Sequence, residues 1–186
     1  LLADVKDTSG GLQYGYFEEP TPGAPNGTLK NGPSEEVIFS VSSGLFTENF
    51  EVELSTATPD SVIRYTTDLS VPTNAIGNPS PIYSGPIEIT ESTQIRTQAF
   101  KNGSLDGGMT TETFLKMSGD VPTFSSTLPV VILSTLGKGA PPGTSATTRK
   151  TAFMFFFEPD PLTGRTVLTQ SPALTTRAGV RRRGSS

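Results

Sequence analysis

The apolar and polar residues between Val37 and Met117 alternate with a period of two. In the stretch FEVELS, Phe50, Val52 and Leu54 face one side and the polar residues between them face the other. This alternation is typical of a β-strand with one buried face. We therefore predict that this part of the chain forms strands and that these three side chains belong to the core.

Three further stretches alternate in the same way and predict more strands. The turn sequences TPDS, NPSPIYSGP and KNGSLDGG separate them at intervals of roughly ten residues, which is typical of a sandwich of two antiparallel sheets. The predicted inward residues are Ile63, Tyr65, Ile87, Ile89, Ile95 and Ala99, and the predicted outward residues are Arg64, Thr66, Glu88 and Arg96.

A different pattern begins after Gly119. LPVVILST is a nearly continuous apolar strand, and KTAFMFFFEPDPLTGRTVLTQ predicts two strands around a turn that contains Pro and Gly. TTRAGVRRRGSS ends in a further predicted strand. An apolar run such as Phe153–Phe157 is normally covered on both faces. We expect its cover to be missing, which predicts an exposed and sticky sheet edge.

Residues 1–33 are rich in Pro and Gly, which leaves no room for a helix and little for a sheet. We interpret them as the tail of one domain followed by a linker. The predicted organisation is therefore this tail, a sandwich at 34–118 and a further unit at 119–186. The fold class is all-β: an antiparallel β-sandwich plus an incomplete second β unit.

Composition narrows the possible chemistry. The chain has 186 residues with neither Cys nor His, so disulfides, thiolate metal sites and the usual nucleophilic triads are excluded within it. The longest apolar runs are far shorter than the roughly 20 residues of a membrane helix, so we predict no membrane span. Because the chain opens on Leu1, we expect a piece of a longer protein, with any signal peptide upstream.

Charge differs between the two ends of the chain. Residues 1–139 hold 7 basic and 16 acidic side chains, whereas 140–186 hold 7 basic and 2 acidic ones, within a net charge of -4. The two ends are therefore interpreted as belonging to different units.

The sequence TDLSVP after the strand around Tyr65 raises the question of a metal loop. Asp68 with Ser70 before Pro72 is a weak candidate for an oxygen-ligand cation site, but hard cations need several such ligands. Asp and Ser commonly bond their own backbone in turns, so we predict a structural turn here. We predict no cofactor and no catalytic residue in this chain.

Three other groups of side chains are candidates for function. Glu51 and Glu53 share a strand face, and we favour a solvated face with Arg64 or Arg96 as cross-strand partner over paired-carboxylate hydrolysis. Tyr83 precedes a Gly-Pro turn and is a candidate ligand contact, although packing is its default role.

The consecutive arginines Arg181, Arg182 and Arg183 alternate sides if they lie in a strand, which works against a single patch for nucleic acid. We therefore predict no nucleic-acid partner. Arg181 and Arg183 are candidate phosphate contacts in a larger domain.

Three stretches resemble known families. SGLFTENFEVELSTATPDSVIRYTTDLSVPT, with PIYSGPIEITESTQIRTQAF and TTETF, resembles the chitobiase/β-hexosaminidase C-terminal-type domain, a small immunoglobulin-like sandwich in extracellular bacterial proteins, over about 37–117. That family usually has Gly after the Asp, where this chain has Leu69. The turn must therefore either avoid a positive φ or carry strain.

The two flanking resemblances are shorter. YFEEPTPGAPN resembles the closing segment of lamin-tail-like domains of large bacterial surface proteins. STLPVVILSTLGKG and AGVRRRGSS are similar to the opening of the CotH kinase-like family, whose catalytic apparatus is then expected beyond Ser186.

The function that these resemblances imply is a noncatalytic spacer or presentation module of a large secreted or cell-surface bacterial protein. Its partners are then the neighbouring domains of the same chain. Two alternatives stay open: a carbohydrate-binding accessory module of an extracellular enzyme, with polysaccharide as partner, and the forepart of a CotH-like protein kinase.

Overall fold

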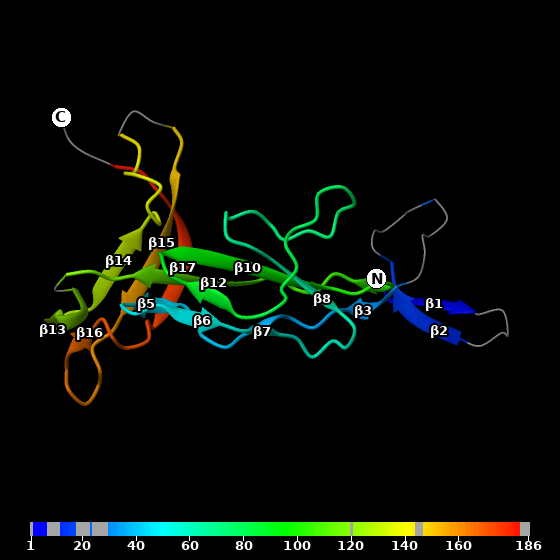
Figure 1. Ribbon diagram of the computed structural model, residues 1–186, viewed down its shortest axis with the longest axis horizontal. Coiled ribbons are helices and arrows are strands. Elements are labelled where there is room, and N and C mark those ends of the chain that lie inside the picture. Colours follow the sequence, from blue (N-terminus) through cyan, green and yellow to red (C-terminus); the bar gives the residue numbers. More distant parts are fainter. Residues whose placement is uncertain are drawn as a thin grey trace. The chain divides into compact units, whose positions relative to one another are not determined.

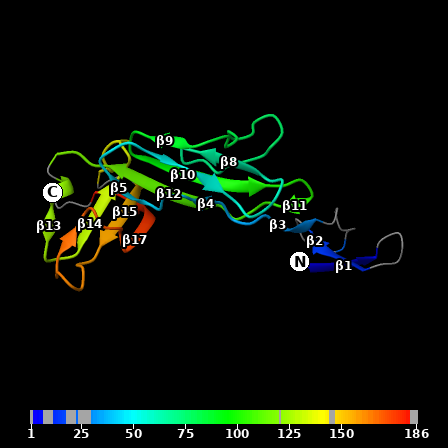
Figure 2. The ribbon, with the colours of Figure 1, turned by 60° about the horizontal axis from the view of Figure 1, so that its bottom comes forward.

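The computed structural model describes residues 2–6, 12–17, 23, 30–119, 121–143 and 147–182. For residues 2–6, 12–15 and 122 it describes the backbone only. Within these ranges the regular secondary structure is almost entirely β (Figures 1 and 2). The predicted all-β class is confirmed. Among the described residues, no helix has the length and apolar character that a membrane crossing requires.

The chain divides into two compact units, each built from several segments. The first unit comprises Leu1–Ser40, Glu53–Gly85 and Ile95–Thr111. The second unit comprises Val41–Val52, Pro86–Gln94 and Glu112–Ser186.

The main sheet has four strands in the order β5-β12-β10-β8. β8 pairs with β10 in the antiparallel direction, whereas β5 pairs with β12 in the parallel direction, which the sequence did not predict. Two shorter antiparallel pairs, β4 with β7 and β6 with β9, complete this region. The bounds are β4 Ile38–Phe39, β5 Gly44–Phe46, β6 Phe50–Val52, β7 Leu54–Ser55, β8 Val62–Thr66, β9 Ile87–Ile89, β10 Thr93–Phe100 and β12 Thr110–Lys116.

Alternation places the predicted core residues inside on most of these strands. Val52, Leu54 and Ile89 are buried, and Ile95 and Ala99 of β10 are fully buried. Exposed glutamates lie between them, as expected for strands with one wet face. The core predicted from the period of two is therefore confirmed at these five positions, whereas Phe50 and Ile87, which were also predicted to face inward, are only half-buried.

Two predicted orientations are wrong. On β8, Thr66 is buried while Ile63 and Tyr65 are only half-buried, because the Thr66 hydroxyl donates a hydrogen bond to the backbone of the following loop. On β10, Arg96 is 9% exposed instead of facing solvent. β10 lies between two strands and is covered on both faces, and its neighbour Thr97 is also buried.

Short strands also form in the segment interpreted as a tail. β1 (Leu2–Lys6) pairs antiparallel with β2 (Leu12–Tyr16). β3 (Asn31–Pro33) pairs in parallel with β11 (Ser104–Leu105), and the Asn31 N–H donates to the Gly103 carbonyl at 2.8 Å. The expectation of little sheet in residues 1–33 is therefore wrong, because three strands of three to five residues form among the described residues of this segment.

The second unit contains a three-stranded antiparallel sheet in the order β14-β15-β17. Its strands are β14 Val130–Ser134, β15 Lys150–Phe157 and β17 Leu174–Val180. A two-stranded sheet of β13 (Ser125–Ser126) and β16 (Thr166–Val167) and a short 3-10 helix η1 (Val121–Thr123) accompany it.

The predicted sticky edge at Phe153–Phe157 is wrong in its location. β15 is the central strand of its sheet, and Phe153, Phe155 and Phe157 are at most 1% exposed. The exposed apolar side chains lie instead on the edge strand β14, where Val131 is 53% and Leu133 is 57% exposed.

The turn after β15 is closed by an aspartate. The Asp160 Oδ1 atom accepts hydrogen bonds from the backbone N–H groups of Leu162 and Thr163, both at 2.9 Å. The hydrogen bonds from Thr163 and then Leu162 hold the pKa of Asp160 below its usual 3.8. The strand that follows, β16, pairs with β13 and not with β15.

Candidate functional site

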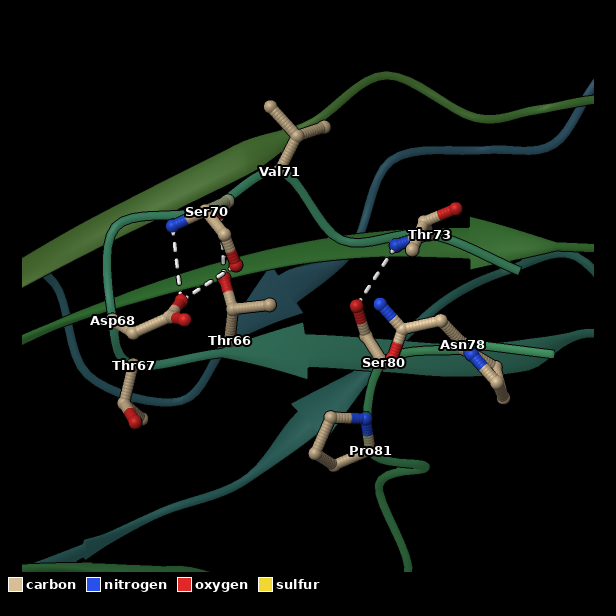
Figure 3. A pocket seen from close by; sticks show the side chains of 10 residues that line it. Thr66, Thr67, Asp68, Ser70, Val71, Thr73, Asn78, Ser80 and Pro81 are labelled. Carbon is tan, nitrogen blue, oxygen red and sulfur yellow. Dashed lines mark hydrogen bonds between the residues drawn. The ribbon is translucent and has the colours of Figure 1, made fainter. Parts of the chain in front are cut away.

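A polar pocket lies in the first unit, between the end of β8 and the loop that leads to Pro81 (Figure 3). Its volume is about 500 Å³, within the range of small-molecule sites in proteins. It is lined by Thr66, Thr67, Asp68, Ser70, Val71, Thr73, Asn78, Pro79, Ser80 and Pro81.

Asp68 shapes the turn on one side of this pocket. Its Oδ1 atom accepts hydrogen bonds from the backbone N–H of Ser70 at 3.0 Å and from the Ser70 hydroxyl at 2.5 Å (Figure 3). The Thr66 hydroxyl donates to the Ser70 carbonyl at 2.7 Å. These are the local bonds by which Asp and Ser stabilise turns. The stretch TDLSVP therefore contains the turn that the sequence predicts.

Leu69 sits in this turn with a φ of 74°. The left-handed region costs an L-residue with a Cβ about 1–2 kcal/mol, so the turn carries the strain that was one of the two options for this position. The Arg96 Nη1 atom donates to the Leu69 carbonyl at 2.7 Å, and its Nη2 atom donates to the Met109 sulfur at 2.9 Å. A buried guanidinium thus supports the strained residue.

The other side of the pocket is held by the pairing of Thr73 with Ser80. The Thr73 N–H donates to the Ser80 hydroxyl at 3.0 Å, and the Ser80 N–H donates to the Thr73 carbonyl at 2.8 Å. Arg64 reaches the same segment, with Nε donating to Asn74 Oδ1 at 2.8 Å and Nη1 to the Ser80 carbonyl at 2.5 Å. The loop is therefore fixed by its own hydrogen bonds.

Thr67 and Asn78 are polar lining residues whose side chains form no hydrogen bonds within the loop. Both are exposed, and within the described part of the chain neither side chain makes a hydrogen bond. Figure 3 shows the Asn78 carboxamide directed toward Ser80. A hydroxyl and an amide at the mouth of a polar pocket can donate to and accept from a neutral polar ligand.

The side chains that line this pocket offer few charged oxygen ligands for a metal ion. Among the described residues that line the pocket, Asp68 alone carries a carboxylate, whereas hard cations take several carboxylate or carbonyl oxygens. Among the described residues there is no group of three or more His, Cys, Asp or Glu side chains that could hold a metal. The role of Asp68 as a metal ligand remains a weak prediction.

The other predicted contact residues lie outside this pocket. Tyr83 is half-buried, and its N–H donates to the Ile63 carbonyl at 2.9 Å. Arg181 and Arg182 are exposed and follow the end of β17 at Val180, so the predicted alternation within a strand does not apply to them. Arg183 lies outside the described residues. Tyr83 and the arginines belong to different units.

The predicted partner of Glu51 is wrong. Glu51 stands opposite Glu88, because β6 pairs with β9 and not with the strands that carry Arg64 and Arg96. Both glutamates are exposed, and water therefore screens their repulsion. Glu53 is exposed as well, so these carboxylates form the solvated face that the sequence favours.

Sequence reasoning missed Thr67, Asn78 and Ser80 as pocket residues. The prolines at 72, 79 and 81 mark this stretch as a loop, but no periodic pattern indicates which of its side chains converge. The convergence arises from the backbone pairing of Thr73 with Ser80, which depends on the folded loop.

Comparison with known proteins supports one of the three resemblances. Residues 41–111 match the family model of the chitobiase/beta-hexosaminidase C-terminal domain. Searches of curated proteins and of solved structures give no match. The central β region of this chain, which includes the pocket, is therefore similar to the chitobiase/beta-hexosaminidase C-terminal domain.

Proposed function

We propose that this chain is a noncatalytic β-sandwich module that spaces and presents neighbouring domains in a larger secreted or cell-surface bacterial protein. One observation carries the proposal. The Asp68 carboxylate, the charged group of the pocket, accepts hydrogen bonds from the Ser70 N–H and hydroxyl, and these bonds shape a turn. A site arranged in this way contributes rigidity, which is what a spacer needs.

The neighbours of the sandwich are part of this proposal. We propose that residues 1–33 close a lamin-tail-like domain, that residues 34–118 form the module, and that residues 119–186 open a CotH-like domain. Residues 1–139 are acidic overall and residues 140–186 are basic overall, which supports assigning the two ends of the chain to different domains. A parent with kinase activity remains an alternative, with Arg181 and Arg183 as phosphate contacts.

A second candidate function is carbohydrate binding for a neighbouring enzyme. It is favoured by the pocket itself, whose volume suits a small ligand and whose Thr67 and Asn78 side chains offer polar groups. The family that matches residues 41–111 is named after two glycosidases. Tyr83 is the candidate contact from the sequence for this role, although packing is its default role.

Affinity electrophoresis of the chain through gels that contain soluble polysaccharides distinguishes the two functions. The spacer proposal predicts the same mobility with and without polysaccharide. Retardation that is lost in Asn78→Ala would replace it with carbohydrate binding at the pocket. Retardation that is lost in Tyr83→Ala would place the contact at the tyrosine. Asn102→Ala, an exposed substitution in a distant turn of the same unit, is the matched control.

A further inference from the structure

β5 and β12, which lie near the two ends of the segment that matches the family model, pair with each other in parallel. β5 lies near the start of the matched segment 41–111, and β12 begins at its end. Their register places Gly44 opposite Phe114, Leu45 opposite Leu115 and Lys116 opposite Phe46. Figures 1 and 2 both show β5 beside β12.

Side chains extend this pairing beyond the ladder at its beginning. The Glu112 Oε2 atom accepts hydrogen bonds from the Ser43 N–H at 2.6 Å and from the Ser43 hydroxyl. The Ser43 Oγ atom in turn accepts from the Thr113 N–H at 2.8 Å. These bonds are part-buried, so water competes with them less than at the surface. They attach the chain before β5 to the start of β12.

The other end of the ladder is closed in the same way. The Met117 N–H donates to the Phe46 carbonyl at 2.7 Å. The Phe46 ring packs edge-on against Phe50 with ring centroids 5.1 Å apart, and Phe50 packs edge-on against Phe114 at 5.3 Å. The Lys116 Nζ atom lies 6.0 Å from the Phe46 centroid. The pairing is thus backed by aromatic packing.

Parallel pairing decides how this contact responds to tension. When the chain before β5 and the chain after β12 are pulled apart, the forces run along the strands in opposite directions. All hydrogen bonds of the ladder and the Ser43–Glu112 bonds are then loaded together in shear. Antiparallel strands pulled at the same end would instead open one bond after another.

We propose that residues 43–46 and 112–117 form a mechanical clamp that lets the module carry load between its neighbours. This rests on the proposed spacer function and adds a property to it, because a spacer in a surface protein has to resist extension. The module would then resist tension between its neighbouring domains in addition to keeping them apart.

The test is single-molecule extension of the full chain between engineered thiols. The chain has no Cys, so only the introduced residues attach. The pair Ser42→Cys with Ser118→Cys pulls at opposite ends of the ladder and loads it in shear. The pair Ser42→Cys with Thr111→Cys pulls at the same end and peels it open. All three positions carry small polar residues; Ser42 and Ser118 are exposed and Thr111 is half-buried.

The clamp predicts an unfolding force that is roughly two- to fourfold higher in the shear geometry than in the peeling geometry, because the bonds share the load. In the shear geometry the event should release about 250 Å of chain, the extended length of residues 42–118. Equal forces in the two geometries would overturn the clamp.

A pair of variants separates mechanical from thermodynamic effects. Glu112→Ala removes the acceptor of the Ser43 bonds and should lower the shear force measurably, with Glu112→Gln as the milder variant if Glu112→Ala does not fold. Leu54→Ala destabilises the core away from the clamp and should lower the shear force less, despite a larger loss of stability. The opposite ranking would contradict the clamp. The spacer function is judged independently, by mobility in polysaccharide gels.

Discussion

Leu69 shows how one residue departs from a local rule when its surroundings compensate. Its φ of 74° is a conformation that glycine adopts freely, and the side chain at this position is half-buried. The turn nevertheless keeps its form because Asp68 bonds Ser70 and Arg96 bonds the Leu69 carbonyl. The strain is therefore local and is offset by bonds on both sides.

Substitution at this residue is expected to reveal the strain. Leu69→Gly relieves a cost of about 1–2 kcal/mol, whereas Leu69→Ala keeps the Cβ in the same conformation and loses packing. We expect Leu69→Gly to exceed Leu69→Ala in free energy of unfolding by about 1 kcal/mol, after allowance for the backbone entropy of glycine. Urea denaturation of both variants measures the difference. Equal stabilities would show that the turn relaxes.

Asp160 predicts a pH dependence that is confined to one turn. Its pKa lies below 3.8 because the Thr163 and Leu162 N–H groups stabilise the carboxylate. The folded turn therefore binds a proton less readily than the unfolded chain. Its contribution to stability is complete above pH 3.8 and is lost as the pH falls through the lowered pKa.

Amide hydrogen exchange of Leu162 and Thr163 tests this dependence. Their protection, corrected for intrinsic exchange, should fall below pH 3.8. In Asp160→Asn the same amides should show no such step, because the amide side chain does not titrate in this range. A step that persists in Asp160→Asn would assign the effect to another group.

At the scale of elements, the accuracy with which a strand's buried residues are predicted from its sequence depends on whether one or both of its faces are buried in the fold. β6 and β9 have one wet face, and their alternation correctly predicts the burial of Val52 and Ile89. β10 is covered on both faces, so its polar residues Thr97 and Arg96 are buried although alternation places Arg96 outside. A period of two cannot report which strand will be central.

Two core substitutions quantify this difference between elements. Leu54 is 6% exposed, and Leu54→Ala should cost about 2–5 kcal/mol. Alternation predicts that Ile63 faces inward as Leu54 does, but Ile63 is half-buried, so Ile63→Ala should cost clearly less. Thermal denaturation of the two variants ranks them. A larger loss for Ile63→Ala would mean that β8 contributes more to the core than its exposure indicates.

At the scale of the whole molecule, the sequence predicts the all-β class and the turns that separate the strands. It does not predict which strands pair with each other. The parallel pairings of β5 with β12 and of β3 with β11 join residues about 70 positions apart. The pocket likewise depends on a loop closed by Thr73 and Ser80. Contacts over such distances come from tertiary packing, which local patterns do not encode.

The exposed apolar edge of β14 is expected to govern self-association of this chain. Val131 and Leu133 are more than half exposed on an edge strand, which can pair with another copy. Leu133→Lys should reduce concentration-dependent association measured by sedimentation velocity, and the melting temperature should change little. Asn102→Lys, which adds the same charge at an exposed turn of the other unit, serves as control. Equal effects of both substitutions would point to net charge as the cause.

The hydrogen bond from the Arg96 guanidinium to the Leu69 carbonyl couples the evolution of these two positions. Arg96 on β10 stabilises the turn through the Leu69 carbonyl, so a leucine at position 69 is easier to accommodate while Arg96 is present, and the two positions are expected to evolve together. In a descendant that loses Arg96 first, the positive φ of Leu69 destabilises the turn, and replacement of Leu69 by glycine is favoured. The order in which these two mutations occur would then decide which sequences this module can still reach.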